Sequence, residues 1–264
     1  MPELLRRGHS ARGPVSEKEK PRQAATVILL REAESKGFEV FLTRRPEGMP
    51  FLGGMYCFPG GGVTKEDRSV RAVERCRGLR AEQARKIIGA QFSPRQAVGF
   101  WVAAVRELFE EAGVLLAVSS SGARVPASQR SGFGRHDQAL FDKPLNFTAL
   151  LANKNLYCDL ASLAYFSHWQ TPAQTSLRFD TRFFIAALPQ DQTPLGISYE
   201  VTHSLWLVPE VAMQRYSRGE LPMIFPTFAS LRTLADFETL ESVMKEFRGR
   251  YSITAATSSR PASR

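Results

Sequence analysis

The sequence predicts a mixed α and β fold of class α+β, and three observations carry this prediction. Two runs of β-branched and aromatic residues stand near the N-terminus, and a long helix with signals at both ends follows at residues 93–113. Further strand-like and helix-like segments then alternate toward the C-terminus, with no internal repeat. The 264 residues suffice for one large domain, and contents of 43% hydrophobic and 23% charged residues are ordinary for a globular protein.

The first predicted elements are two strands and a glycine-rich loop. The runs Ala24–Glu32 and Phe38–Arg45 are rich in β-branched and aromatic residues and are joined by the turn-forming "AESKG", which predicts a β-hairpin. Residues 45–62 are dense in glycine and proline, so this segment is predicted to be a loop with one short strand near Met55–Phe58.

A basic segment and the long helix come next. Residues 68–92 contain good helix formers and predict one or two short basic helices, interrupted at Gly78. The long helix has an N-cap, a first-turn proline, a capping-box partner and a C-terminal glycine, namely Ser93, Pro94, Gln96 and Gly113. Its apolar residues follow three- and four-residue spacing and predict one buried stripe: Val98, Trp101, Val105, Leu108 and Ala112.

The rest of the chain is predicted to continue the alternation of strands and helices. A strand is expected at Val114–Leu116, then a loop, and then a helix at Gln138–Lys154. Three strands and two helices are expected, in order, at 163–169, 181–188, 199–208, Pro209–Arg218 and Pro226–Arg248.

The net charge of +9 is concentrated at the two ends of the chain and in one internal segment. Residues 1–22 and 249–264 each carry +3 and are predicted to be disordered tails around one domain at 23–248. Residues 68–95 carry +6, and the remainder of the chain carries −3. Because two thirds of the net charge lies in the tails, no nucleic-acid partner is expected.

Neither a membrane span nor a signal peptide is predicted. No run of about 18 apolar residues occurs, and the N-terminal region lacks an apolar segment and contains acids. The three cysteines (Cys57, Cys76 and Cys158) form no CxxC pair, which favours idle thiols over a disulfide framework or a zinc site. A cytoplasmic location without a membrane partner is therefore expected.

Three carboxylates lie on one edge of the long helix. Glu107 is three residues from Glu110 and four from Glu111, so the three side chains converge beside the buried stripe. Such an oxygen-only cluster suits Mg²⁺ or Mn²⁺. The helix contains no histidine, which argues against a ferritin-like di-iron site. By composition alone, a solvated glutamate-rich helix face remains the alternative.

The order of residues around these acids is more specific than their number. The stretch "RELFEEAGV" (Arg106–Val114) resembles the REUxEExGU core of the Nudix box, where U is a bulky aliphatic residue, and it matches every fixed position. The segment "CFPGGG" at Cys57–Gly62 resembles the glycine half of that box. Arg106 lies 45 positions beyond Gly61, where the compact pattern places it 14 beyond, so an insertion of 31 residues separates the halves. Asp67 stands at the acidic position that usually holds glutamate.

An interrupted box resembles one subgroup of the family, the animal motif-19-type coenzyme A diphosphatases and their bacterial relatives. The resemblance covers about residues 24–228 and also includes the motifs "VFLTRRP", "HWQTP", "RFDTRFFIA", the pair Glu200 and Trp206, and "FPT". It implies a Nudix fold, an α/β/α sandwich, with a helical insertion at 68–95 inside the box and a C-terminal helical extension.

The resemblance also implies a metal site. Glu107, Glu110 and Glu111 would hold Mg²⁺ or Mn²⁺, and Gly60 would contribute its backbone carbonyl. Arg106 would orient the acids and pair with Asp67 across the insertion. In this family the general base is a glutamate of the box or one from a distant segment; Glu200 is the candidate for the second case, and an exposed strand carboxylate is the alternative. Three residues are candidates for phosphate contacts: Arg44, Arg45 and Gly61.

The implied activity is the metal-dependent hydrolysis of a diphosphate bridge in a small nucleotide. Coenzyme A or acyl-coenzyme A, cleaved to 3′,5′-ADP and an (acyl-)phosphopantetheine, is the leading substrate class. ADP-ribose, ADP-sugars and dinucleotides stay open, as does a non-catalytic Nudix module that only binds a nucleotide. The oligomeric state is left open, with a homodimer among the options.

Three further features carry two interpretations each. The basic insertion is interpreted as a lid or wall that attracts a polyphosphorylated substrate, or as a solvated excursion. Trp169 and the neighbouring His168 would stack on an adenine or pack against the core. Arg178 is expected to form a structural ion pair with Asp180.

Overall fold

The computed structural model describes residues 20–125, 146–175, 177–196, 198 and 200–250. Its strands are β1 (Arg22–Glu32), β2 (Phe38–Arg44), β3 (Tyr56–Cys57), β4 (Gly60–Gly62), β5 (Cys76–Arg77), β6 (Ala117–Val118), β7 (Tyr157–Asp159), β8 (Leu163–Gln170), β9 (Phe179–Ala187) and β10 (His203–Leu207). Its helices are α1 (Val70–Glu74), α2 (Ala81–Ile88), α3 (Pro94–Ala112), α6 (Phe147–Asn153), α7 (Pro209–Ser217), α8 (Phe225–Leu234) and α9 (Leu240–Gly249), with the 3-10 turn η1 (Leu160–Ser162).

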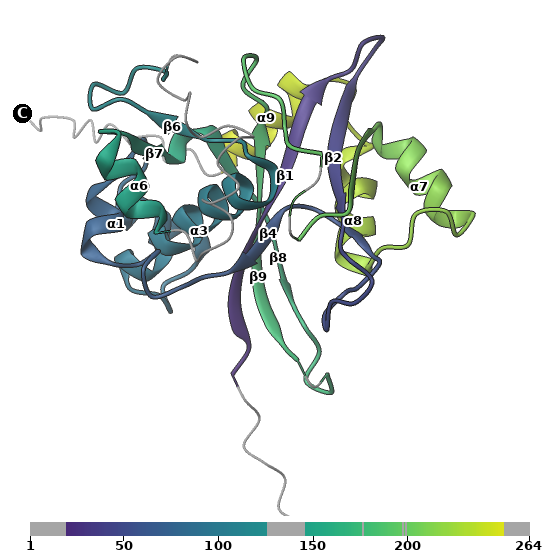
Figure 1. Ribbon diagram of the computed structural model, residues 1–264, viewed down its shortest axis with the longest axis horizontal. Coiled ribbons are helices and arrows are strands. Elements are labelled where there is room, and N and C mark those ends of the chain that lie inside the picture. The colour runs from purple at the N-terminus through teal and green to yellow at the C-terminus, as the bar shows by residue number, and fades with distance from the viewer. Residues whose placement is uncertain (1–19, 126–145, 176, 197, 199, 251–264) are drawn as a thin grey trace, which may run out of the picture.

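A mixed sheet with helices on both faces forms the centre of the protein. The strand order is β10-β2-β1-β9-β8, with β3 added to β2 and β4 added to β1. Side chains alternate along β1, so Val27 and Leu29 pack under α3 while Ile28 and Leu30 pack under α8 and α9. Figure 1 shows α1, α3 and α6 on one side of the sheet and α7 and α8 on the other. This is the α/β/α sandwich that the interrupted box implies.

The predicted β1–β2 hairpin is present, with Gly37 in the left-handed region (φ 87°) at its turn. The predicted short strand near residue 56 is β3. Strand β4 was not predicted, because three consecutive glycines have a low preference for strands. It forms through pairing with β1, where Thr26 lies opposite Gly60.

Helix α3 begins and ends where its capping residues predict. The Ser93 side chain accepts from the Gln96 backbone N–H, and the Gln96 side chain accepts in return from the Ser93 N–H. Gly113 ends the helix in the left-handed region (φ 67°), where its N–H donates to the Phe109 carbonyl. All five residues of the predicted stripe are buried, as are most other residues of α3, because the insertion covers the side that faces away from the sheet.

The insertion forms two short helices, as predicted, and also a strand. Helices α1 and α2 pack on α3, and β5 between them pairs in parallel with β7, which pairs in turn with β6. The insertion is therefore tied to the core by a small second sheet. That sheet depends on a strand about 80 residues away in sequence, so no local pattern marks it.

Two predictions of secondary structure are wrong. Val114–Leu116 is not a strand, because the Gln192 side chain donates to the Leu115 carbonyl and accepts from its N–H in place of a neighbouring strand. The long helix expected at Pro226–Arg248 is two helices, α8 and α9, since Thr239 caps a new helix through the Ser242 N–H. Of the helix expected at Gln138–Lys154, the part after residue 145 is α6, and the rest lies outside the described residues.

Within the described residues, no helix is long and apolar enough to cross a membrane.

Candidate active site

The two halves of the interrupted box lie side by side, because β4 packs against α3. A side-chain carbon added to Gly61 would lie 2.5 Å from Glu107 Oε1 and 2.7 Å from Oε2, so the carboxylate occupies the space that only glycine leaves. A side-chain carbon on Gly60 would clash with the β1 backbone at Ala25. Gly60 is therefore required by its close approach to the sheet, and Gly61 lets the Glu107 carboxylate keep the position in which Arg106 holds it.

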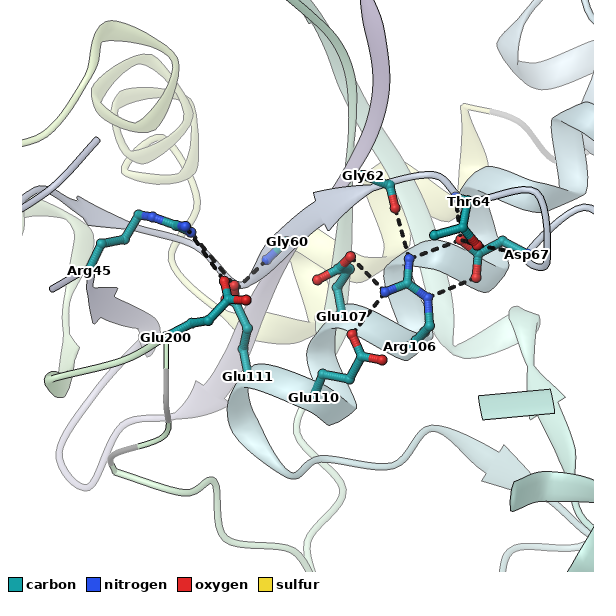
Figure 2. Close-up of polar contacts among 10 residues, drawn as sticks. All are labelled: Arg45, Gly60, Gly62, Thr64, Asp67, Arg106, Glu107, Glu110, Glu111 and Glu200. Carbon is teal, nitrogen blue, oxygen red and sulfur yellow. Dashed lines mark hydrogen bonds and ion pairs between the residues drawn. The ribbon is translucent and has the colours of Figure 1, made fainter. Parts of the chain in front are cut away.

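Arg106 joins the second half of the box to Asp67, across the insertion (Figure 2). Its Nε and Nη2 donate to Asp67 at 2.8 and 2.9 Å, and Nη1 donates to Glu107 at 2.7 Å and to Glu110 at 2.8 Å. Nη2 also donates to the Gly62 carbonyl at 2.8 Å. The guanidinium side chain is only 10% exposed. The contact between Arg106 and Asp67 is the one that the resemblance implies.

Thr64, which the sequence interpretation missed, fixes Asp67. The Thr64 N–H and hydroxyl donate to Asp67 Oδ2 at 2.8 and 2.9 Å. A threonine three residues before an aspartate is a typical pattern for such a local turn, and this spacing is the signal that was available in the sequence.

The other end of the cluster is held by Arg45. Its Nη1 lies 3.8 Å from Glu111 and its Nη2 lies 3.5 Å from Glu200. The Gly60 N–H donates to Glu111 Oε2 at 3.3 Å. Glu200 thus lies beside the box although it is 89 positions beyond Glu111, and its side chain is 48% exposed. The sequence interpretation assigned separate roles to Arg45, Glu111 and Glu200, and the structure brings the three side chains together.

Burial raises the pKa of each of the three box carboxylates, Glu107, Glu110 and Glu111. It raises the pKa of Glu107 to about 7, against the favourable charge of Arg106. Burial and the nearby charge of Glu107 raise the pKa of Glu111 well above its ordinary range. The pKa of Glu110 is also raised, chiefly by burial. For Arg106, burial disfavours the charged form, but the hydrogen bonds that it donates to Asp67 and the negative charge of Glu107 outweigh this effect and raise the pKa.

The residues fit a hard divalent cation, although no three acids, cysteines or histidines of the described residues lie close enough to hold one as they stand. The donors are oxygen atoms only, as Mg²⁺ and Mn²⁺ prefer. The pKa values of the buried acids stay raised although Arg106 and Arg45 lie beside them, so a further positive charge would stabilise their ionised forms. Gly60 lies opposite Thr26 in the β1–β4 ladder, and the Val27 N–H donates to the Pro59 carbonyl in the next pair. Gly60 and Thr26 therefore form a pair without hydrogen bonds between their backbones. The Gly60 N–H and carbonyl therefore both point away from β1, and the N–H donates to Glu111.

A cavity of about 700 Å³ opens beside this cluster. Residues of the cluster that line it are Gly60–Gly62, Glu107, Arg45 and Glu200. The residues of the "HWQTP" and "FPT" motifs that line it are Trp169–Pro172 and Phe225–Thr227, which were predicted only as parts of the resemblance.

Two expectations about binding residues and one about a structural ion pair need correction. Arg44 does not line the cavity, because its side chain turns to Glu47 and to the Gly54 carbonyl. The insertion contributes no lining residue, since it packs behind α3, so it is not the wall of this cavity. Asp180 pairs with His168 at 2.6 Å and with Arg182 at 3.6 Å, and so not with the predicted Arg178.

The α/β/α sandwich, with the glycine strand β4 packed against the glutamate-bearing helix α3, is the arrangement that defines the Nudix class. A family model described as the NUDT19 Nudix domain matches residues 21–234, and the chain belongs to this family.

Similar proteins come from animals and bacteria. The acyl-coenzyme A diphosphatase NUDT19 of Homo sapiens is 28% identical over 83% of this chain and 66% of its own length, and that of Gallus gallus is 27% identical over 85% and 70%. The chain thus spans about two thirds of the length of these relatives. The crystal structure of a Nudix hydrolase from Alicyclobacillus acidocaldarius superposes with a TM-score of 0.65 at 27% identity, covering 86% of this chain and 96% of that one. These findings confirm the predicted family and fold.

Proposed function

We propose that this protein is a metal-dependent hydrolase that cleaves the diphosphate bridge of coenzyme A or acyl-coenzyme A. The products would be 3′,5′-ADP and phosphopantetheine or its acyl derivative. The observation that carries the proposal is the Glu107 carboxylate in the space left by Gly61, beside a cavity large enough for a substrate arm. The family match and the printed activity of the animal relatives support the choice of substrate.

Glu107, Glu110, Glu111 and the Gly60 carbonyl are the proposed ligands of Mg²⁺ or Mn²⁺. A divalent ion bound there would neutralise the diphosphate and lower the pKa of a bound water. The contacts around the acids favour these roles, because Arg106 aligns Glu107 and Glu110 while the Gly60 N–H aligns Glu111.

The remaining roles belong to the open end of the cluster. Arg45 lines the cavity and would contact a phosphate oxygen, and the Gly61 backbone would let the diphosphate approach closely. Glu200 is the proposed general base, which takes a proton from the attacking water as the P–O bond of the bridge breaks. Its place beside Glu111 and Arg45 supports this role, and its partial exposure leaves it open to water.

A substrate panel with product masses tests the proposal. The wild-type protein is incubated with Mg²⁺ or Mn²⁺ and with coenzyme A, an acyl-coenzyme A, ADP-ribose or a dinucleotide. We expect 3′,5′-ADP and a phosphopantetheine, a loss of about 10²–10³ in kcat for Glu111→Gln, and no loss for Glu210→Gln on the exposed side of α7.

Each other outcome has a distinct meaning. Turnover of ADP-ribose to AMP and ribose phosphate, with coenzyme A left intact, would move the substrate to the ADP-linked class. Absence of turnover on every diphosphate, with wild type and Glu111→Gln alike, would refute the enzyme and leave a nucleotide-binding module. A small-molecule nucleotide is the proposed partner in every case.

A further inference from the structure

The connection between β9 and β10, at residues 188–202, carries Glu200 and is fastened to two other elements of the site. We propose that Gln192 and Thr202, in the two halves of this connection, are positioning residues that hold Glu200 beside the box. The inference rests on the proposed function, in particular on Glu200 as the general base. Neither Gln192 nor Thr202 lines the cavity, so both would act through Glu200 and not on the substrate.

The first half of the connection is fastened to the end of α3, the helix that carries the box acids. The Gln192 side chain donates to the Leu115 carbonyl at 2.9 Å and accepts from the Leu115 N–H at 2.8 Å. The Leu195 N–H donates at 2.8 Å to the carbonyl of Ala112, the residue that follows Glu111. Three hydrogen bonds therefore set the place of this half relative to Glu111.

Gly113 leaves the space that this attachment needs. A side-chain carbon added to Gly113 would lie 2.8 Å from Leu195 Cγ, so Leu195 would have to shift away from the helix end. The fixed glycine of the box therefore has two roles, since it ends α3 in the left-handed region and admits the connection beside it. Only the first of these roles was predicted from the sequence.

The second half of the connection is fastened to the end of β2. The Thr202 N–H and hydroxyl both donate to the Arg44 carbonyl, at 3.0 and 3.1 Å. Arg44 is the last residue of β2, and the next residue, Arg45, lies 3.5 Å from Glu200. This attachment therefore sets Glu200 relative to the arginine that it faces.

Glu200 lies in a tight turn between the two attachments. Ser198 and Val201 close the turn by exchanging two backbone hydrogen bonds, at 3.0 and 3.2 Å. Val201 is buried, whereas the Glu200 side chain is half-exposed. An exposed side chain gains little from packing, so the place of this carboxylate depends on how the turn is held. Since a misplacement of about 1 Å can cost about a hundredfold in rate, loosening either attachment should slow the reaction.

The test measures kcat and KM for coenzyme A, with Mg²⁺, in Gln192→Ala and in Thr202→Val, each with and without Glu200→Gln. We expect kcat to fall about tenfold in Gln192→Ala and about threefold in Thr202→Val. KM should change by less than about twofold, because neither residue lines the cavity. In the Glu200→Gln background neither substitution should lower kcat further, since the group that they position has been removed.

Thr233→Val is the matched control, because the Thr233 hydroxyl also donates to a backbone carbonyl at 3.1 Å, that of Ala229 in α8. Its kcat should equal that of the wild type. Equal factors of loss with and without Glu200→Gln would show a general structural effect and would overturn the inference. A wild-type kcat in both Gln192→Ala and Thr202→Val would overturn it as well. If Gln192→Ala does not fold, Thr202→Val decides between these outcomes.

A failure of the proposed function is recognised separately, in proteins whose attachments are intact. A wild-type protein that leaves coenzyme A intact contradicts the proposed activity. A wild-type kcat in Glu200→Gln contradicts its role as the base, and the inference then falls with that role while the hydrolase stands.

Discussion

Two arginines hold the two ends of the glutamate cluster, and they do so very differently. At the closed end, which we call the clamp, Arg106 bonds Asp67, Gly62, Glu107 and Glu110 at 2.7 to 2.9 Å. At the open end, which we call the mouth, Arg45 faces Glu111 and Glu200 at 3.8 and 3.5 Å.

The difference lies in unused bonding capacity. Arg106 is largely buried, and each of its three guanidinium nitrogens donates to at least one oxygen. The buried Nε of Arg45 has no hydrogen-bond partner among the described residues. Nη2 of Arg45 donates to Met49 Sδ, but both Nη atoms meet the acids only at 3.5 and 3.8 Å, so a ligand in the cavity can bind them without displacing a short hydrogen bond to an acid. The clamp therefore fixes the geometry of the site, and the mouth is where a substrate can bind.

Breaking the clamp should have the largest effect. Asp67→Ala leaves the buried Arg106 without its main partner, and removing one partner of a buried ion pair costs about 3–5 kcal/mol of the free energy of unfolding. Urea denaturation measures the loss. The control is Asp236→Ala, which breaks the exposed pair with Arg232 and should cost far less than Asp67→Ala, because solvent screens that pair. Equal losses in the two variants would show that the clamp does not stabilise the fold.

Helix α3, which carries Arg106, and the segment that follows it show which structure could be predicted from the sequence alone. The caps of α3 depend on residues within four positions of one another, so Ser93, Gln96 and Gly113 were enough to place the helix. Val114–Leu116 has the composition of a strand, but its backbone partner is the Gln192 side chain 77 positions away from Leu115. A partner at that distance leaves no local pattern.

The candidate site divides in the same way. The motif order placed the box acids and the pair of Arg106 and Asp67, because a resemblance carries tertiary information that composition does not. That Phe51, Phe179 and Phe225 line one cavity was not predicted, since these residues come from a loop, a strand and a helix start with no spacing in common. Only the fold brings them together.

The pH dependence of the unfolding free energy is a second test of the clamp, because Glu107 accepts a hydrogen bond from Arg106 there. Its pKa is raised from 4.5 to about 7 in the folded protein, so the folded state holds this proton after the unfolded state has released it. In metal-free buffer, the unfolding free energy of the wild type relative to Glu107→Gln should therefore fall as the pH rises from about 4.5 to about 7, by up to about 3 kcal/mol. Above that window the difference should be constant.

Urea denaturation at several pH values in a chelator measures this difference, with Glu210→Gln as the control for removing an exposed carboxylate. Adding Mg²⁺ at pH 8 should restore stability to the wild type more than to Glu107→Gln, because the ion binds the ionised folded form. A difference that rises with pH across the window would contradict both the burial of the acid and its proposed role as a ligand.

A substitution at the mouth should lower the catalytic rate and should hardly change the free energy of unfolding. Glu200→Gln removes a half-exposed carboxylate whose distance from Arg45 is 3.5 Å, so the free energy of unfolding should change by less than about 0.5 kcal/mol. If Glu200 is the general base, kcat should fall about a hundredfold, equivalent to about 2.7 kcal/mol. Glu220→Gln, an exposed acid after α7, is the matched control. Retention of the wild-type kcat would return the role of base to a glutamate of the box, and the mouth would then only position the substrate.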